Sequence, residues 1–242
     1  MRWKLGLAAI LGLAVVGAIC AVGSGTHRLT KPGSIRLFTP PPEYEWKSGG
    51  APDSQSYVRP AVEEYLSKVP PGARVLDLGC GNGSMLGSFL DKGWQLVGVD
   101  ISKTGIEQAR KRWPGAQFEV GDATGDLSSL GQFDAIYSTE VIEHLVLPRR
   151  FAQNVFLLLK PGGVVVVSVP YHGWLKNVTI ALLDRYDAHH QPLVDWGHIK
   201  FWSPSTLSRL FWEAGLDEVE YRGTGRVPYL WKSMGMVARK PK

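Results

Sequence analysis

Cysteine is scarce in this chain. Among its 242 residues only two are cysteine, Cys20 and Cys80. A chain with so few thiols cannot be a disulfide-stapled scaffold, and it cannot build a zinc site from cysteines alone. The protein must therefore be held together by an ordinary apolar core.

An excess of charge of one sign is also lacking. The 27 Lys and Arg residues against 22 Asp and Glu leave a net charge of +5. So small a balance permits attraction to anionic lipid or nucleic acid but demands neither. No basic stripe with interleaved aromatic residues is present, so we expect no nucleic-acid partner. With 28 Gly, 16 Pro and 44% hydrophobic residues, the composition is that of one globular α/β domain with an appendage.

One long apolar run stands near the amino terminus. Residues 5–22 carry no charge, and their number is at the lower end of what spans a bilayer as a helix. We expect residues 1–24 to be a membrane anchor, with a signal peptide as the alternative. Basic residues are slightly more numerous after the run than before it, which favours a cytoplasmic carboxyl-terminal side. Residues 25–56 are rich in Pro and Gly and are predicted to be a tether.

Short apolar segments then alternate with segments of helical periodicity. Strands are expected at 74–78, 95–100, 117–120, 135–138 and 164–169, and helices at 57–69, 84–92, 102–112, 149–159 and 207–214. This alternation predicts a parallel sheet with helices on both faces. The domain is expected to cover residues 57–242, with an insert at 171–203.

A glycine loop, DLGCGNG at residues 77–83, joins the first expected strand to the next helix. Glycines let the backbone approach a ligand closely, and Asp100, about twenty residues on, can accept hydrogen bonds from ribose hydroxyls. A dinucleotide would need glycine where Ser84 stands, and Asp77 would repel its pyrophosphate. An NAD-type oxidoreductase is thus the disfavoured alternative. The loop suits a cation such as S-adenosylmethionine, which carries a sulfonium and an ammonium and no phosphate.

Five motifs, in order, resemble those of class I S-adenosylmethionine-dependent methyltransferases: VLDLGCGNG, VGVD, GDA, FDAIYSTEVIEHL and LKPGG. The resemblance covers about residues 57 to 240. It implies a Rossmann-like, seven-stranded, mostly parallel sheet with an antiparallel last strand, and segments 217–221 and 230–238 would supply the last two strands. Within that superfamily the chain is most similar to the ubiquinone-biosynthesis O-methyltransferases, through EVIEH at 140–144, Gly173-Trp174, and His198 near Phe201.

The resemblance also implies which residues hold the cofactor. The methionine end would be held by Asp77, Gly79 and Gly81, the ribose by Asp100, and the adenine by Ile101, Asp122 and Ala123. Thr139 would lie near the methionine portion, and Arg59 would form a fork with the cofactor carboxylate. The plainer alternatives are a turn-capping acid for Asp122 and an exposed helix residue for Arg59.

Catalytic residues are expected just after the fourth strand. Glu140, Glu143 and His144 would share one face of a helix if a helix begins there. Together with His198 they would suit a divalent cation such as Mg²⁺, as in the similar small-RNA 2′-O-methyltransferases. Without a metal, Glu143, His144 and His198 would form a base for the acceptor proton, with His144 or His198 as the proton acceptor. The plainest alternative is an ion pair with no catalytic role.

These features together predict methyl transfer from S-adenosylmethionine, with the insert as a lid over the acceptor. The acceptor is expected to be a small hydroxylated or phenolic molecule, such as a quinone precursor or a lipid-linked sugar. A non-catalytic cofactor-binding protein and an RNA 2′-O-methyltransferase are the remaining alternatives. Because the cofactor is cytosolic, we expect an uncleaved single-pass anchor with the catalytic domain in the cytoplasm.

Overall fold

The computed structural model describes residues 44–46 and 52–242. The expected membrane anchor, residues 1–24, and most of the expected tether, residues 25–56, lie outside these residues. Among the residues that are described, no helix is both long enough and apolar enough to cross a membrane. The described residues all belong to one compact unit, Pro40–Lys242.

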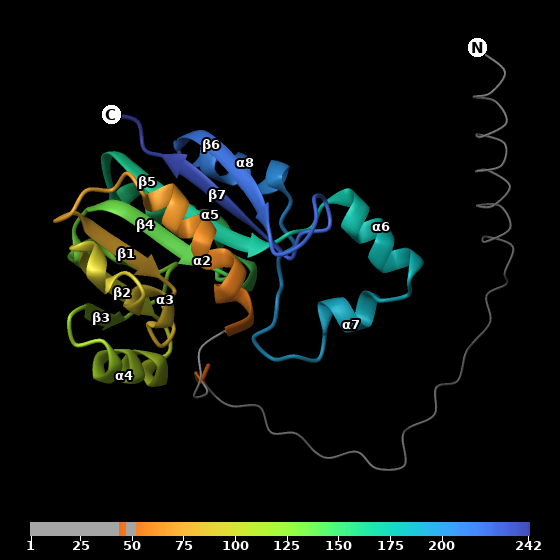
Figure 1. Ribbon diagram of the computed structural model, residues 1–242, viewed down its shortest axis with the longest axis horizontal. Coiled ribbons are helices and arrows are strands. Elements are labelled where there is room, and N and C mark those ends of the chain that lie inside the picture. The colour runs from red at the N-terminus through yellow and green to blue at the C-terminus, as the bar shows by residue number, and fades with distance from the viewer. Residues whose placement is uncertain (1–43, 47–51) are drawn as a thin grey trace, which may run out of the picture. The chain divides into compact units, whose positions relative to one another are not determined.

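Seven strands form one sheet in the order β3-β2-β1-β4-β5-β7-β6 (Figure 1). Strands β1 to β5 pair in parallel, whereas β7 lies between β5 and β6 and is antiparallel to both. The prediction of a mostly parallel sheet with an antiparallel last strand is therefore confirmed. The strands are β1 (Arg74–Leu78), β2 (Gln95–Asp100), β3 (Gln117–Val120), β4 (Phe133–Thr139), β5 (Leu159–Pro170), β6 (Asp217–Thr224) and β7 (Ser233–Arg239).

The helices mostly follow the expected periodicity, with differences at their ends. The first described helix begins at Pro52 rather than at residue 57, and the helix expected over 84–92 ends early and is followed by a short 3₁₀ turn, Leu90–Lys92. The insert contains two helices that the periodicity did not reveal. The helices are α2 (Pro52–Leu66), α3 (Ser84–Gly87), α4 (Lys103–Arg112), α5 (Pro148–Leu158), α6 (Trp174–Leu182), α7 (Tyr186–His190) and α8 (Pro204–Glu213).

The two faces of the sheet carry separate apolar cores, because side chains alternate along each strand. In β5, Val165 and Val167 pack into the core shared with α5 and α8. Val164 and Val166 pack into the core shared with α2, α3 and α4. Helices on both faces, as the alternation of strands and helices predicted, hold the sheet rigidly between two layers.

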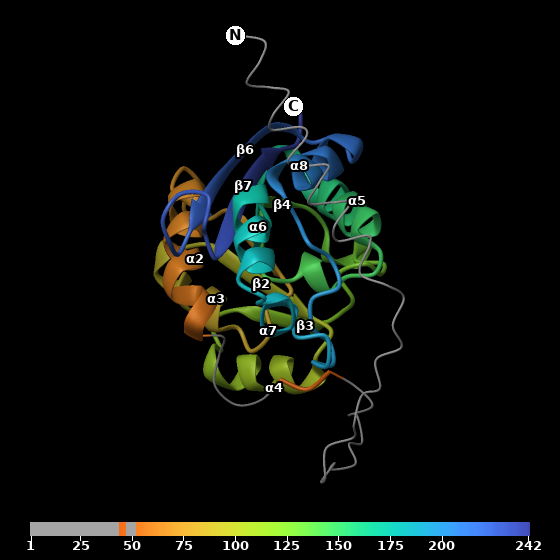
Figure 2. The same cartoon turned by 90° about the vertical axis from the view of Figure 1, so that its right-hand side faces the viewer.

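The insert, residues 171–203, follows β5 and extends outward from the carboxyl ends of the parallel strands (Figures 1 and 2). Its two ends enter the core through Tyr171 and Trp202, which are 5% and 8% exposed. The aromatic side chains between them are exposed by about half or more: Trp174, Tyr186, Trp196 and Phe201. Among these aromatic residues of the insert, only Tyr171 and Trp202 at its two ends are therefore buried in the core.

Candidate functional site

The glycine loop after β1 adopts a conformation that only glycine accepts readily. Gly79, Gly81 and Gly83 have φ angles of 91°, 55° and 72°. A side chain at Gly79 would collide with Val141, and a Cβ at Gly81 would lie 2.7 Å from the Trp46 ring. The backbone of this loop is therefore approached closely from two sides, as a ligand-binding loop requires.

Asp100, the last residue of β2, supports this loop. Its Oδ2 accepts the Gly81 N–H at 2.8 Å and its Oδ1 accepts the Ser102 N–H at 2.8 Å. Burial raises the pKa of Asp100, and these two hydrogen bonds oppose the rise. Each oxygen keeps a lone pair for a ligand hydroxyl. The adjacent Ile101 is 59% exposed and offers an apolar surface to a ring.

Asp77 is a buried acid beside the Tyr137 hydroxyl. It is 1% exposed, and within the described part of the chain neither carboxyl oxygen has a partner. Tyr137, its register partner on β4, has a buried hydroxyl in the same condition. Burial raises the pKa of Asp77 to about 8, and the nearby Tyr137 hydroxyl opposes this only in part. Because an unsatisfied buried carboxyl is costly, the site fits a cationic group.

The positions of the other predicted cofactor residues do not by themselves indicate a ligand. Asp122 is exposed, and its Oδ1 accepts from the Thr124 N–H and hydroxyl at 2.7 and 2.8 Å, as a turn cap does. Ala123 is 8% exposed, and its carbonyl accepts from the Asn154 amide. Thr139 ends β4. Arg59 is exposed on α2, with its Nε 3.7 Å from Glu63. Their roles in cofactor binding stay predictions.

Two aromatic residues beside the glycine loop were missed from the sequence. The backbone N–H of Trp46 donates to Thr104 Oγ1 at 3.1 Å, and the backbone carbonyl of Trp46 accepts from Gln108 Nε2 at 3.1 Å. The backbone of Trp46 is therefore hydrogen-bonded to α4. Tyr44 is half-buried, and its pKa is raised by burial and by Asp100. The sequence feature that could have revealed this contact is the pair Tyr44 and Trp46, two aromatic residues in a stretch otherwise rich in Pro, Gly and Ser.

The chain after β4 departs from the prediction. Glu140 has a φ of 55°, and only a single 3₁₀ turn, Ile142–His144, follows it. The expected helix is therefore wrong, and Glu140 does not share a helical face with Glu143 and His144. Its carboxylate instead accepts from Ser168 Oγ at 2.9 Å and Ser233 Oγ at 3.2 Å. Burial raises the pKa of Glu140 to about 7.

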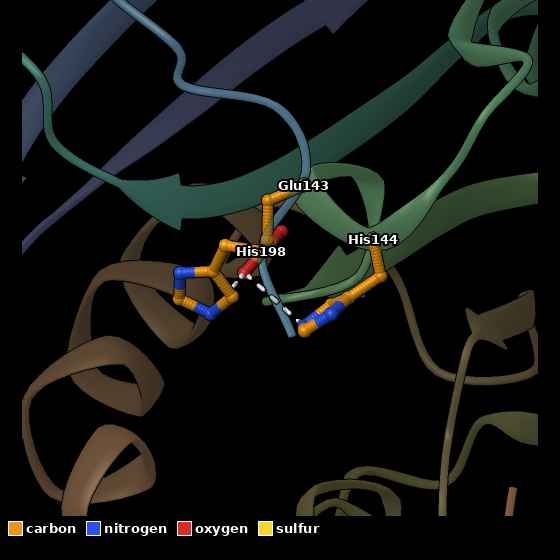
Figure 3. A group of neighbouring side chains, drawn as sticks. All are labelled: Glu143, His144 and His198. Atoms are coloured by element: carbon orange, nitrogen blue, oxygen red, sulfur yellow. Dashed lines mark ion pairs between the residues drawn. The ribbon is translucent and has the colours of Figure 1, made fainter. Parts of the chain in front are cut away.

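Glu143, His144 and His198 are nevertheless brought together (Figure 3). Glu143 Oε1 lies 3.9 Å from Nε2 of each histidine, and the two rings are 4.8 Å apart. The Glu143 carbonyl accepts from the Ile199 and Lys200 N–H groups at 2.9 Å each, which holds the end of the insert here. Glu143 is fully buried, and burial with the nearby Glu140 raises its pKa well above the usual range.

The surroundings of the two imidazoles differ. His144 Nδ1 lies 2.7 Å from the Trp196 carbonyl oxygen. Because a carbonyl only accepts, Nδ1 carries the hydrogen, and a neutral ring then has its lone pair on Nε2. Burial and His144 lower the pKa of His198 to about 4, so this ring is neutral at pH 7. The neutral His198 ring and the His144 ring therefore flank one buried carboxyl.

The predicted magnesium site is not supported by this arrangement. Glu143, His144 and His198 each offer a ligand atom, and these atoms lie within 4.8 Å of one another. Two imidazoles and one carboxylate suit a transition metal, whereas Mg²⁺ prefers oxygen ligands. Glu140, the expected fourth ligand, is engaged with two serines.

Known proteins with related sequences place the chain in a family. The model of a family described as a methyltransferase domain matches residues 53–221, and the chain belongs to this family. The sequence is 34% identical over 134 residues to 2-methyl-6-phytyl-1,4-hydroquinone methyltransferase of Synechocystis, which covers 50% of this chain and 42% of that protein. It is 29% identical over 161 residues to ubiquinone biosynthesis O-methyltransferase of Nitrobacter winogradskyi. This match covers 65% of this chain and 62% of that protein. The chain thus spans less than two thirds of either relative.

Solved structures agree on the fold. A TehB-like S-adenosylmethionine-dependent methyltransferase from Corynebacterium glutamicum superposes with a TM-score of 0.53 at 21% identity, over 74% of this chain and 85% of that one. The resemblance to class I S-adenosylmethionine-dependent methyltransferases is confirmed in the family and in the fold.

Proposed function

We propose that this chain transfers the methyl group of S-adenosylmethionine to a hydroxyl oxygen of a small hydroxylated or phenolic acceptor, such as a quinone precursor or a lipid-linked sugar. The observation that carries the proposal is the buried Glu143 carboxyl between two imidazoles at the carboxyl edge of the sheet. The names of the two relatives, a hydroquinone methyltransferase and an O-methyltransferase, support an oxygen-bearing aromatic acceptor.

The residues around the glycine loop fit the cofactor. The unpartnered Asp77 carboxyl suits its ammonium, the free lone pairs of Asp100 suit the ribose hydroxyls, and the exposed Ile101 suits the adenine. Trp46 would cover Gly81 from the outside. The bound cofactor supplies a methyl group on a sulfonium, which an acceptor oxygen displaces in line. The protein aligns the two reactants, and such alignment lowers barriers strongly.

Proton removal from the acceptor falls to the three residues after β4 and at the end of the insert. His144 Nε2 holds an available lone pair, because its Nδ1 hydrogen is held by the Trp196 carbonyl. As the imidazole gains the acceptor proton, its positive charge favours ionisation of the adjacent Glu143 carboxyl, and the ionised form stabilises the ring. His198 also lies beside the Glu143 carboxyl, with its Nε2 3.9 Å from Oε1. A positioned base of this kind contributes roughly 10²–10⁴-fold to the rate.

The proposal includes a place at the membrane. The uncharged run at 5–22 would act as a single-pass anchor, with the catalytic domain in the cytoplasm where the cofactor is made. An anchored domain would meet a lipid-soluble acceptor at the membrane surface.

The test is incubation of the full chain with methyl-labelled S-adenosylmethionine and separate lipid, sugar and RNA extracts. We expect label in the lipid or sugar fraction, and a strong loss of it in Glu143→Gln and His144→Gln. Glu213→Gln, an exposed acid on α8, is the matched control and should transfer normally. Label in RNA alone, or cofactor binding with no label in any fraction, would contradict the proposal.

A further inference from the structure

A cavity of about 710 Å³ lies between helices α6 and α7 of the insert and the loop joining β6 to β7. Figures 1 and 2 both place this loop beside α6. Its volume is in the range of small-molecule sites, roughly 300–1,000 Å³. The cavity is separate from the cofactor loop, because no residue of the described glycine loop lines it.

The wall of this cavity is positively charged. Lys176, Arg185 and Arg226 line it together with His189, and no Asp or Glu is among the described residues that do. Within the described part of the chain, none of the three cations is in an ion pair with a carboxylate. Three cations facing one space without acids form a site for an anion.

Among these residues, Lys176 gives the strongest support for an anion site. It is only 7% exposed, and its ammonium donates one long hydrogen bond, 3.4 Å, to the Lys232 carbonyl. Burial and the nearby Arg226 lower its pKa to about 8, so it is still mostly charged at pH 7. The acid that raises the pKa of Lys176, Glu140, accepts hydrogen bonds from two serine hydroxyls. A buried ammonium in such surroundings gains from a ligand anion.

The rest of the wall is apolar. Ile180 of α6 and Leu183, which caps this helix, line the same cavity. Val227 and Leu230 of the β6–β7 loop line it as well. Leu183 and Val227 are 64% and 63% exposed, so a hydrocarbon group lying here would remove apolar surface from water. Charge and apolar surface in one cavity match a molecule that has both.

Two wall residues of the cavity, Lys176 and His189, lie within electrostatic reach of His198. His189 lines the cavity and also contacts His172, with ring centres 5.5 Å apart. Lys176 and His189 both lower the pKa of His198, whose Nε2 lies 3.9 Å from Glu143 Oε1. A molecule in the cavity is therefore near the place where the acceptor hydroxyl must be.

We propose that this cavity binds an anionic amphiphile, a single molecule with a carboxylate or phosphate beside a hydrocarbon group, and that the methyl acceptor belongs to this class. The inference rests on the proposed methyl transfer and narrows its substrate. The anion lies against Lys176 and Arg226, and the hydrocarbon lies against the Leu183 and Leu230 side.

The test uses dodecyl phosphate below its micellar concentration, titrated calorimetrically into the full chain saturated with S-adenosylhomocysteine. Inorganic phosphate and dodecyl maltoside probe the head and the tail alone. We expect dodecyl phosphate to bind at least tenfold tighter than either. Lys176→Met and Arg226→Gln should each weaken it tenfold or more, while Lys111→Met, an exposed cation on α4, should leave it unchanged.

Arg226 lies exposed on the loop, so its substitution leaves the core intact, and melting temperatures check the fold of each variant. Equal binding of the neutral maltoside, unchanged binding in both cavity variants, or binding to anionic vesicles but not to monomeric dodecyl phosphate would overturn the proposal. The proposed function fails differently. A wild-type chain that binds dodecyl phosphate through Lys176 and Arg226, but binds no S-adenosylhomocysteine, keeps the cavity as an anion site and refutes methyl transfer.

Discussion

Lowering the pH from 8 to 6 should weaken S-adenosylhomocysteine binding through Asp77. Burial raises the pKa of this carboxyl to about 8 in the free protein, so below pH 8 it is mostly protonated. The ammonium of the ligand favours the ionised form, and binding must then release a proton. Affinity is therefore greatest above pH 8 and falls as the pH falls through that value.

The size of the effect follows from the pKa. Each pH unit below it costs up to about 1.4 kcal/mol, or tenfold in affinity. At pH 6 the binding should be up to roughly 100-fold weaker than its high-pH limit. Calorimetry in two buffers of different ionisation enthalpy should count about 0.9 protons released at pH 7.

Two neighbouring groups need a control. Burial also raises the pKa of Asp100, which would add to the slope, and it raises that of Cys80, which stays neutral throughout. Asp77→Asn isolates the contribution of Asp77: it should bind more weakly and lose most of the pH dependence. An affinity that is flat from pH 6 to 8, or a slope that survives Asp77→Asn, would refute the reasoning.

Further predictions concern Trp46 over the glycine loop, the proposed catalytic base, and the apolar core. Trp46→Ala removes the ring over Gly81 and should weaken S-adenosylhomocysteine binding about tenfold by calorimetry, whereas Trp212→Ala, 57% exposed on α8, should not. Glu143→Gln should lower kcat about 100-fold with little change in KM. Chelation with EDTA should leave kcat unchanged, and a loss restored by added metal would contradict a metal-free base. Phe151→Ala empties a fully buried site on α5 and should cost about 3–5 kcal/mol of unfolding free energy in urea.

The strands were the most predictable part of the fold. Arg74–Leu78, Gln95–Asp100 and Gln117–Val120 match their predicted ranges. The first two are short, mainly apolar runs, and the third alternates polar and apolar residues. β5 is longer than predicted and begins at Leu159, since the LKPGG segment also pairs with β4 through a register shift. Local pattern could not reveal pairing that depends on the neighbouring strand.

Glu143, His144 and His198 lie close together, but not for the local reason expected from the sequence, and their catalytic role stays a prediction. Helical spacing placed Glu140 beside Glu143 and His144, yet the chain reverses at Glu140 and leaves only one 3₁₀ turn. Glu143 and His144 meet His198 because the Glu143 carbonyl binds the backbone of Ile199 and Lys200. The spacing of residues along the sequence does not predict such a long-range contact.

The segment before the domain and the insert were the least predictable. Trp46 was assigned to a tether by its Pro- and Gly-rich surroundings, although its backbone is bonded to α4. In α6, Trp174 and Leu182 are 73% and 80% exposed, so this helix lacks the clear one-sided burial from which helices are recognised.

Transfer of labelled methyl from S-adenosylmethionine to a hydroxylated acceptor is the most direct test of the account. We predict that the full chain labels a lipid or sugar fraction, that Glu143→Gln reduces this label about 100-fold while still binding S-adenosylhomocysteine, and that base treatment leaves the new methyl ether intact. Tight cofactor binding without label in any fraction, or equal labelling by wild type and Glu143→Gln, would contradict it.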